Sequence, residues 1–74
     1  MPELPRVSGN DAIKIFEKLG FKTVRQRGSH VVLRKDNKGC VIPVHKELAI
    51  GTLRSAIKQA GITLEEFIKA YKDI

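Results

Sequence analysis

Two histidines, three arginines and a serine are the residues of this chain whose types and spacing suit chemistry on a phosphodiester. Imidazole accepts and donates a proton near neutral pH, and guanidinium holds an anionic phosphate. His30 ends the run Arg-Gln-Arg-Gly-Ser-His, and His45 ends the segment Val-Ile-Pro-Val-His. We therefore take His30 as the candidate catalytic residue and His45 as the candidate second acid or base. The candidate RNA-binding residues are Arg25, Arg27, Ser29 and Arg34.

RNA is a substrate that two such imidazoles can cleave without a metal ion. A base removes the proton of a 2′-hydroxyl, the oxygen attacks the adjacent phosphorus, and an acid protonates the leaving 5′-oxygen. Nearby arginines would stabilise the charge that develops in the transition state. Other interpretations stay open at this point: His30 as a polar residue beside a turn, His45 as a tie for the following loop, and the arginines as a solvated face.

The sequence contains no pattern typical of a metal site or of a serine nucleophile. Two histidines and the single Cys40 lack the spacing of a zinc site, and no cluster of carboxylates indicates a two-metal nuclease. Ser29 lacks the Gly-x-Ser-x-Gly frame of a nucleophile elbow. Gly51-Thr52 is interpreted as an ordinary helix start and not as a phosphate site. We expect no metal and no small-molecule cofactor.

Length and charge favour a small basic domain with an anionic partner. The 74 residues are expected to form a single domain over 1–74, and the formal net charge of +6 favours nucleic acid. Cys40 is expected in a buried strand of a protein from a reducing compartment. The opening Met-Pro-Glu-Leu-Pro does not resemble a signal peptide, and no apolar run is long enough to span a membrane. We therefore expect a cytoplasmic protein.

The first half of the chain changes from a helical period to a strand period. Residues 9–19 carry apolar side chains at helical spacing after the N-cap candidate Ser8. From residue 21 onward the period is two, which predicts an antiparallel meander. The strands are expected at residues 22–27, 30–35 and 40–44, joined by a two-residue turn at 28–29 and a four-residue turn at 36–39.

Two helices are expected in the second half of the chain. The first ends at Gly61, and the second begins at the N-cap Thr63, with Glu66 completing a capping box. The order α-β-β-β-α-α predicts an α+β fold, with a three-stranded antiparallel sheet covered by helices on one face.

The expected turn lengths fix a register that sorts the side chains of the sheet onto two faces. The first turn places Arg27 opposite His30, and the second places His30 opposite His45. Directly opposed side chains are neighbours, so the two histidines would lie close together. The expected buried face holds Val24, Val31, Leu33, Ile42 and Val44, and the expected open face holds Arg25, Arg27, His30, Arg34 and His45.

Five short motifs along the chain carry a family resemblance through their order and spacing. They are Leu19-Gly20-Phe21, Arg25-Gln26-x-Gly28-Ser29-His30, Val41-Ile42-Pro43-Val44-His45, Gly51-Thr52-Leu53-Arg54 and Ala60-Gly61. Taken together, from Ser8 to Phe67, they closely resemble the HicA toxin family of HicAB toxin–antitoxin systems.

The resemblance implies a fold similar to the double-stranded RNA-binding domain, α-β-β-β-α, with an additional C-terminal helix. It implies the toxin of a type II toxin–antitoxin system, an endoribonuclease that cleaves mRNA, arrests translation and growth, and is neutralised by a HicB-type antitoxin over its active face. The family's catalytic histidine transfers to His30, whereas no catalytic role carries over to His45. We expect the antitoxin interface to include Arg25, Arg27, His30 and Arg34.

Two other functions agree with the same composition. A non-catalytic module of the double-stranded RNA-binding type would have the same charge and the same helices. A basic adaptor for an acidic protein would bind RNA only weakly and lose it at moderate salt. His30 separates the enzyme from the RNA-binding module, because binding alone does not require an imidazole.

Overall fold

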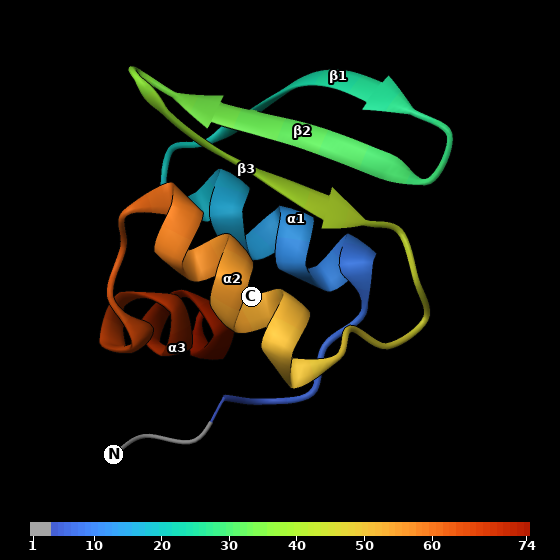
Figure 1. Cartoon of the computed structure of the whole chain (residues 1–74). Coiled ribbons are helices and arrows are strands. Elements are labelled where there is room, and N and C mark those ends of the chain that lie inside the picture. The colour runs from blue at the N-terminus through green and yellow to red at the C-terminus, as the bar shows by residue number, and fades with distance from the viewer. Residues whose placement is uncertain (1–3) are drawn as a thin grey trace.

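The computed structural model describes residues 4–74 and places a sheet over a layer of helices (Figure 1). Residues 1–3 lie outside the described residues. They are part of the predicted domain and of the opening segment on which the signal-peptide prediction is based. The strand order β1-β2-β3, all antiparallel, confirms the predicted α+β fold. The elements are α1 Gly9–Lys18, β1 Lys22–Arg27, β2 His30–Lys35, β3 Lys38–Pro43, α2 Ile50–Ala60 and α3 Leu64–Lys72.

Local signals set the helix ends, as predicted. The Ser8 hydroxyl accepts a hydrogen bond from the Asp11 amide at 3.0 Å, and α1 ends at Lys18, one residue before the predicted end. Thr63 and Glu66 form a reciprocal capping box, with bonds of 2.9 and 3.1 Å. The bond from the Thr63 amide is the main reason why the pKa of the Glu66 carboxyl lies below its usual value.

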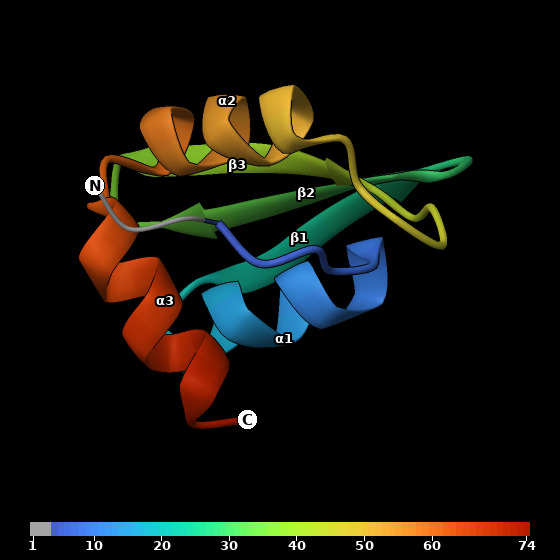
Figure 2. The same cartoon turned by 90° about the horizontal axis from the view of Figure 1, so that it is seen from below.

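The helices cover one face of the sheet and enclose a core of aromatic and aliphatic side chains. Figure 2 shows α2 running along β3 and α1 beneath β1, with α3 packed against α1. The Phe16 ring lies at the centre of this core, 5.5 Å from the Phe21 ring and 5.6 Å from the Phe67 ring between centroids. Because Phe67 is fully buried, α3 is part of the core.

The predicted register between β2 and β3 is wrong by two residues. Asp36 and Asn37 alone form the turn, since Asp36 adopts a left-handed backbone with φ of 56° and β3 already begins at Lys38. His30 therefore pairs with Pro43 and not with His45, and Val31 pairs with Ile42. A shift of two residues leaves every side chain on its predicted face, so Val31, Leu33 and Ile42 are buried as expected.

A β-bulge overturns the prediction for Val24. The pairing of β1 with β2 shifts between Thr23 and Arg25, so Thr23 takes the place opposite Leu33 and Val24 is 56% exposed. On the turn side of the bulge, Arg25 pairs with Val32 and Arg27 with His30, as predicted, whereas Lys22 pairs with Arg34 in the shifted register. At the other edge β3 ends at Pro43, one residue before the predicted end, and Val44 is only partly buried against the core.

Candidate active site

Both histidines line one open groove of about 530 Å³ between β3, the loop that follows it and α2. His30 reaches the groove from the start of β2, and His45 reaches it from the loop, two residues after β3 ends. The wrong strand register therefore did not separate the two predicted residues. The other lining residues are Val41, Pro43, Gly51, Thr52, Ser55, Ala56 and Gln59.

The β1–β2 turn positions His30. Gly28 has φ of 56°, a conformation that glycine adopts without steric cost, and no side chain would meet a Cβ there. This turn brings Arg27 directly opposite His30 in the antiparallel pair. Both side chains are exposed, so an imidazole and a guanidinium stand next to each other in solvent.

Two backbone hydrogen bonds position the loop segment that carries His45. The Val44 amide donates to the Ser29 carbonyl at 2.6 Å, and the Gly9 amide donates to the His45 carbonyl at 2.8 Å. Gly9 approaches so closely that a Cβ there would overlap the Pro43 carbonyl and lie 2.8 Å from the Val44 Cα. The start of α1 and the β1–β2 turn thus hold the loop segment that carries His45.

The first turn of α2 adds backbone donors to the groove. Ala49 occupies the N-cap and makes no side-chain hydrogen bond, so the first amides of α2 have no capping acceptor. Gly51 and Thr52 of this turn line the groove, and a Cβ on Gly51 would find nothing within 4 Å. Free amides at a helix start favour an anion such as phosphate. The helix start that sequence reasoning set aside therefore belongs to the same groove as the histidines.

The three predicted arginines lie on the open face of the sheet, outside the residues that line the groove. Arg27 is the nearest in register, since it pairs with His30, and Arg25 pairs with Val32. Arg34 lies four residues along β2 from His30, which is about 13 Å at the rise of a strand. Ser29 is exposed and reaches the site through its carbonyl bond to Val44.

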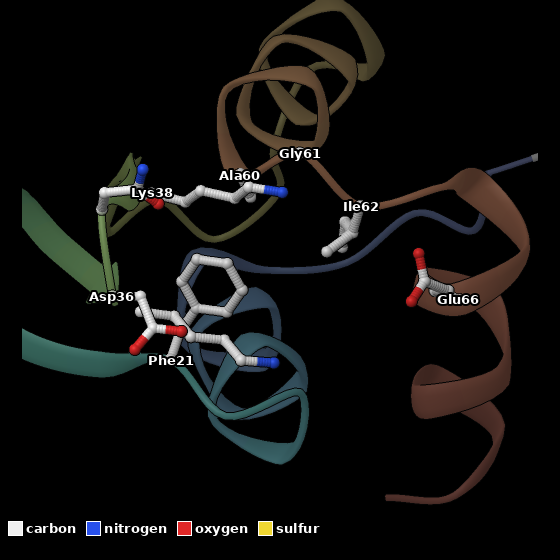
Figure 3. Close-up of a pocket in the computed structure, with 9 residues that line it drawn as sticks. Phe21, Asp36, Lys38, Ala60, Gly61, Ile62 and Glu66 are labelled. Carbon is white, nitrogen blue, oxygen red and sulfur yellow. The ribbon is translucent and has the colours of Figure 1, made fainter.

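A second hollow, of about 210 Å³, lies at the other end of the sheet (Figure 3). Three of its charged side chains contact the ends of helices. The Lys35 ammonium donates to the Leu19 carbonyl at 2.8 Å, and the Glu66 carboxylate accepts from Thr63. Lys38 packs against Gly61, which follows α2. These contacts give the hollow a structural role and leave the histidine groove as the candidate site.

Within residues 4–74, no group of three histidine, cysteine, aspartate or glutamate side chains is arranged to hold a metal ion. Cys40 is buried in β3, and its desolvation raises the pKa of the thiol to about 11. A thiol in that state is a packing group and not a nucleophile. The three helices described in the same part of the chain are too short or too polar to cross a bilayer.

Sequence reasoning missed the wall of the groove that α2 forms. Ser55 and Gln59 are exposed residues of a helix whose only clear sequence signal is its buried stripe. Their spacing from Thr52, three and seven residues, places all three on one side of the helix. That pattern was available in the sequence, but the packing of α2 along β3 was not.

Comparison with known protein families gives one match that includes this groove. The family model described as HicA toxin of bacterial toxin–antitoxin matches residues 9–62, well over half of the chain. The matched span contains His30, His45 and the whole of α2, and it ends just before α3. A search of curated proteins finds no match to this sequence.

Proposed function

This chain belongs to the HicA toxin family of bacterial toxin–antitoxin systems, and from that premise we propose that it is a metal-independent endoribonuclease that cleaves messenger RNA. His30 is the catalytic histidine, and residues 1–74 act as a single toxin domain. The observation that carries the proposal is the shared groove, which both imidazoles and the first turn of α2 line. Loss of intact messenger RNA would arrest translation and growth.

The proposed reaction is a transesterification within the RNA strand. One imidazole removes the 2′-hydroxyl proton, the oxygen attacks the adjacent phosphorus, and the bond to the 5′-oxygen breaks as a protonated imidazole supplies its proton. The products are a 2′,3′-cyclic phosphate and a 5′-hydroxyl, and no metal or cofactor takes part. His30 fills one role, and His45, which lines the same groove, fills the other.

Backbone amides and one guanidinium stabilise the negative charge of the transition state. The first amides of α2 lie at the groove without a capping acceptor. Arg27 pairs with His30 across the hairpin and is the cation closest in register to that histidine. Arg25 and Arg34, farther along the sheet, bind the neighbouring phosphates of the strand.

The test is single-turnover cleavage of an end-labelled messenger RNA in EDTA by wild-type protein, His30→Ala and His45→Ala. Both imidazoles are exposed and make no hydrogen bond within residues 4–74, so neither substitution removes a contact of the fold. Removing an acid or base lowers such rates by about 10²- to 10⁴-fold. We expect that loss for both variants at unchanged RNA affinity, with a cyclic phosphate on the wild-type product.

Each of the other results would indicate a different function or mechanism for this chain. Binding of RNA without scission by the wild type would point to a non-catalytic module of the double-stranded RNA-binding type. Scission that stops in EDTA would contradict a metal-independent mechanism. A full rate for His45→Ala with a loss for His30→Ala would leave His30 as the catalytic residue and assign the second proton transfer to another group.

We further propose that a HicB-type antitoxin covers the open face of the sheet. That face combines apolar and cationic surface: Val41 is 41% exposed, Val32 is partly exposed, and the arginines surround them. Apolar contacts together with carboxylates opposite the guanidiniums would bind such a face. The interface includes Arg25, Arg27, His30 and Arg34.

Charge reversal at Arg34 separates inhibition from catalysis, because this residue lies about 13 Å along β2 from His30. At saturating RNA we expect Arg34→Glu to cleave at nearly the wild-type single-turnover rate, although its RNA affinity falls because a phosphate contact is lost. It should resist the antitoxin, since a like-charge contact replaces an attractive one. The matched control is Lys14→Glu, an exposed residue of α1 on the helical side of the sheet. Equal inhibition of Arg34→Glu and wild type would place the antitoxin elsewhere.

A further inference from the structure

One side of α2 carries polar side chains that have no part in the proton transfers. Thr52, Ser55 and Gln59 all line the groove, and all three are exposed. Within residues 4–74 none of these side chains makes a hydrogen bond to the protein. Two hydroxyls and one amide are therefore free to bind a ligand that enters the groove.

The floor beneath these side chains is apolar. Ala56 and Pro43 are buried, and Val41 presents its side chain at 41% exposure. The groove volume of about 530 Å³ falls within the roughly 300–1,000 Å³ of sites that hold small organic ligands. An apolar floor with hydrogen-bonding groups along one wall suits a flat heterocycle with a polar edge, which is the shape of a nucleobase.

The uncapped amides and the polar wall belong to the same helix. The free amides lie in the first turn of α2, and Ser55 and Gln59 follow one and two turns later. From Thr52 to Gln59 the helix rises about 10 Å. A nucleotide whose phosphate lies at the first turn can therefore place its base along the same side of α2.

We propose that this groove seats the base next to the scissile phosphate, and that Ser55 and Gln59 bind its edge and so set the sequence preference of cleavage. The inference rests on the proposed function above. Its substrate is single-stranded RNA, because protein side chains recognise RNA sequence mainly through bases that are splayed out of a helix. The Gln59 amide offers a donor beside an acceptor, the arrangement that binds a base edge through two hydrogen bonds.

The experiment uses the full chain and a pool of RNA that is randomised over a short single-stranded window. Wild type, Ser55→Ala and Gln59→Ala cleave the pool, and sequencing of the product ends gives the base preference at each position around the cut. Lys58→Ala is the matched control, because Lys58 is an exposed residue of α2 outside the groove. In parallel, His30→Ala and the double variant of His30→Ala with Gln59→Ala select bound sequences from the same pool.

We expect Gln59→Ala and Ser55→Ala to weaken the preference about tenfold at one position beside the cut. Lys58→Ala should keep the wild-type preference, because its side chain lies outside the groove. Cleavage by Gln59→Ala and Ser55→Ala with the wild-type preference would overturn the inference and leave the proposed nuclease intact. In another outcome, the wild type fails to cleave while His30→Ala selects a base preference that the double variant lacks. That result would support base binding in the groove and overturn only the proposed nuclease activity. No cleavage by the wild type, together with bound pools that show no base preference, would overturn both the nuclease activity and the base site.

Discussion

Replacing Gly9 with alanine tests how the start of α1 holds the loop that carries His45. Gly9 donates its amide hydrogen to the His45 carbonyl, and no room remains for a side chain at this contact. A Cβ would overlap the Pro43 carbonyl and lie 2.8 Å from the Val44 Cα, whereas ordinary contacts of a Cβ begin at 3.4 Å. The loop segment must therefore retreat by at least about 0.6 Å, the difference of these distances at Val44, and by more at the Pro43 carbonyl.

The same substitution at Gly51 provides a matched control for the size of this effect. Both glycines lie in the first turn of a helix, but a Cβ on Gly51 would find nothing within 4 Å. Alanine in place of a helical glycine without strain stabilises a protein by about 0.5–1 kcal/mol. Overpacking at a tight contact costs about 1–3 kcal/mol. The two variants should therefore differ by about 1.5–4 kcal/mol in free energy of unfolding.

Urea and thermal unfolding of both variants measure this difference. For a domain of this size, 1 kcal/mol corresponds to roughly 4–8 °C in Tm, so Gly9→Ala should melt at least about 6 °C below Gly51→Ala. Gly9→Ala should also cleave RNA more slowly under conditions in which it is fully folded, because a displacement of about 1 Å in a catalytic group can cost about 100-fold. Equal stability of the two variants would refute the close contact, and a full cleavage rate would refute its role in placing His45.

Three further predictions concern the core and the titratable groups. Phe67→Ala removes the ring that packs on Phe16 and should cost about 3–5 kcal/mol, enough to unfold so small a domain, so a cooperative melt with wild-type Tm would contradict it. Burial raises the pKa of the Cys40 thiol from 9.0 to about 11. The neutral thiol therefore stabilises the folded state fully below pH 9, and this contribution of roughly 2–3 kcal/mol is lost as pH rises to 11. Cys40→Val should flatten that part of the alkaline profile of the urea midpoint. The pKa of Glu66 is lowered, first by its bond from the Thr63 amide, so its stabilisation is present above the usual carboxyl pKa and is lost as pH falls through the lower one; Glu66→Gln should flatten the acid limb, and an unchanged limb would show that the carboxylate contributes nothing.

The sequence predicted those parts of the fold that depend on neighbouring residues. Ser8 and Thr63 cap their helices through bonds to amides three residues away. Gly28 makes the β1–β2 turn with a positive φ. In each case the signal and the structure it specifies lie within a few positions of each other, so no tertiary contact has to be known.

The errors arose where two local choices competed. Gly39 seemed to complete a four-residue turn, but Asp36 takes the left-handed conformation and leaves Gly39 in β3, where a Cβ would lie 2.9 Å from the Leu33 carbonyl. The bulge at Val24 leaves no clear mark in an alternating pattern, because every residue of β1 is exposed. The groove wall on α2 required the packing of that helix along β3, which no short stretch of sequence contains.

The position of α3 has a consequence for folding of the chain during its synthesis on the ribosome. Phe67 is fully buried against Phe16, fifty-one positions earlier, although α3 lies beyond the part of the chain that matches the family. A nascent chain that has emerged only as far as Ile62 therefore contains both histidines but lacks the ring that closes the core. We expect such a chain to be inert until α3 has emerged and Phe67 can close the core. A chain that is stopped after Ile62 should show no cooperative melt and no growth arrest, and arrest by that fragment would contradict this expectation.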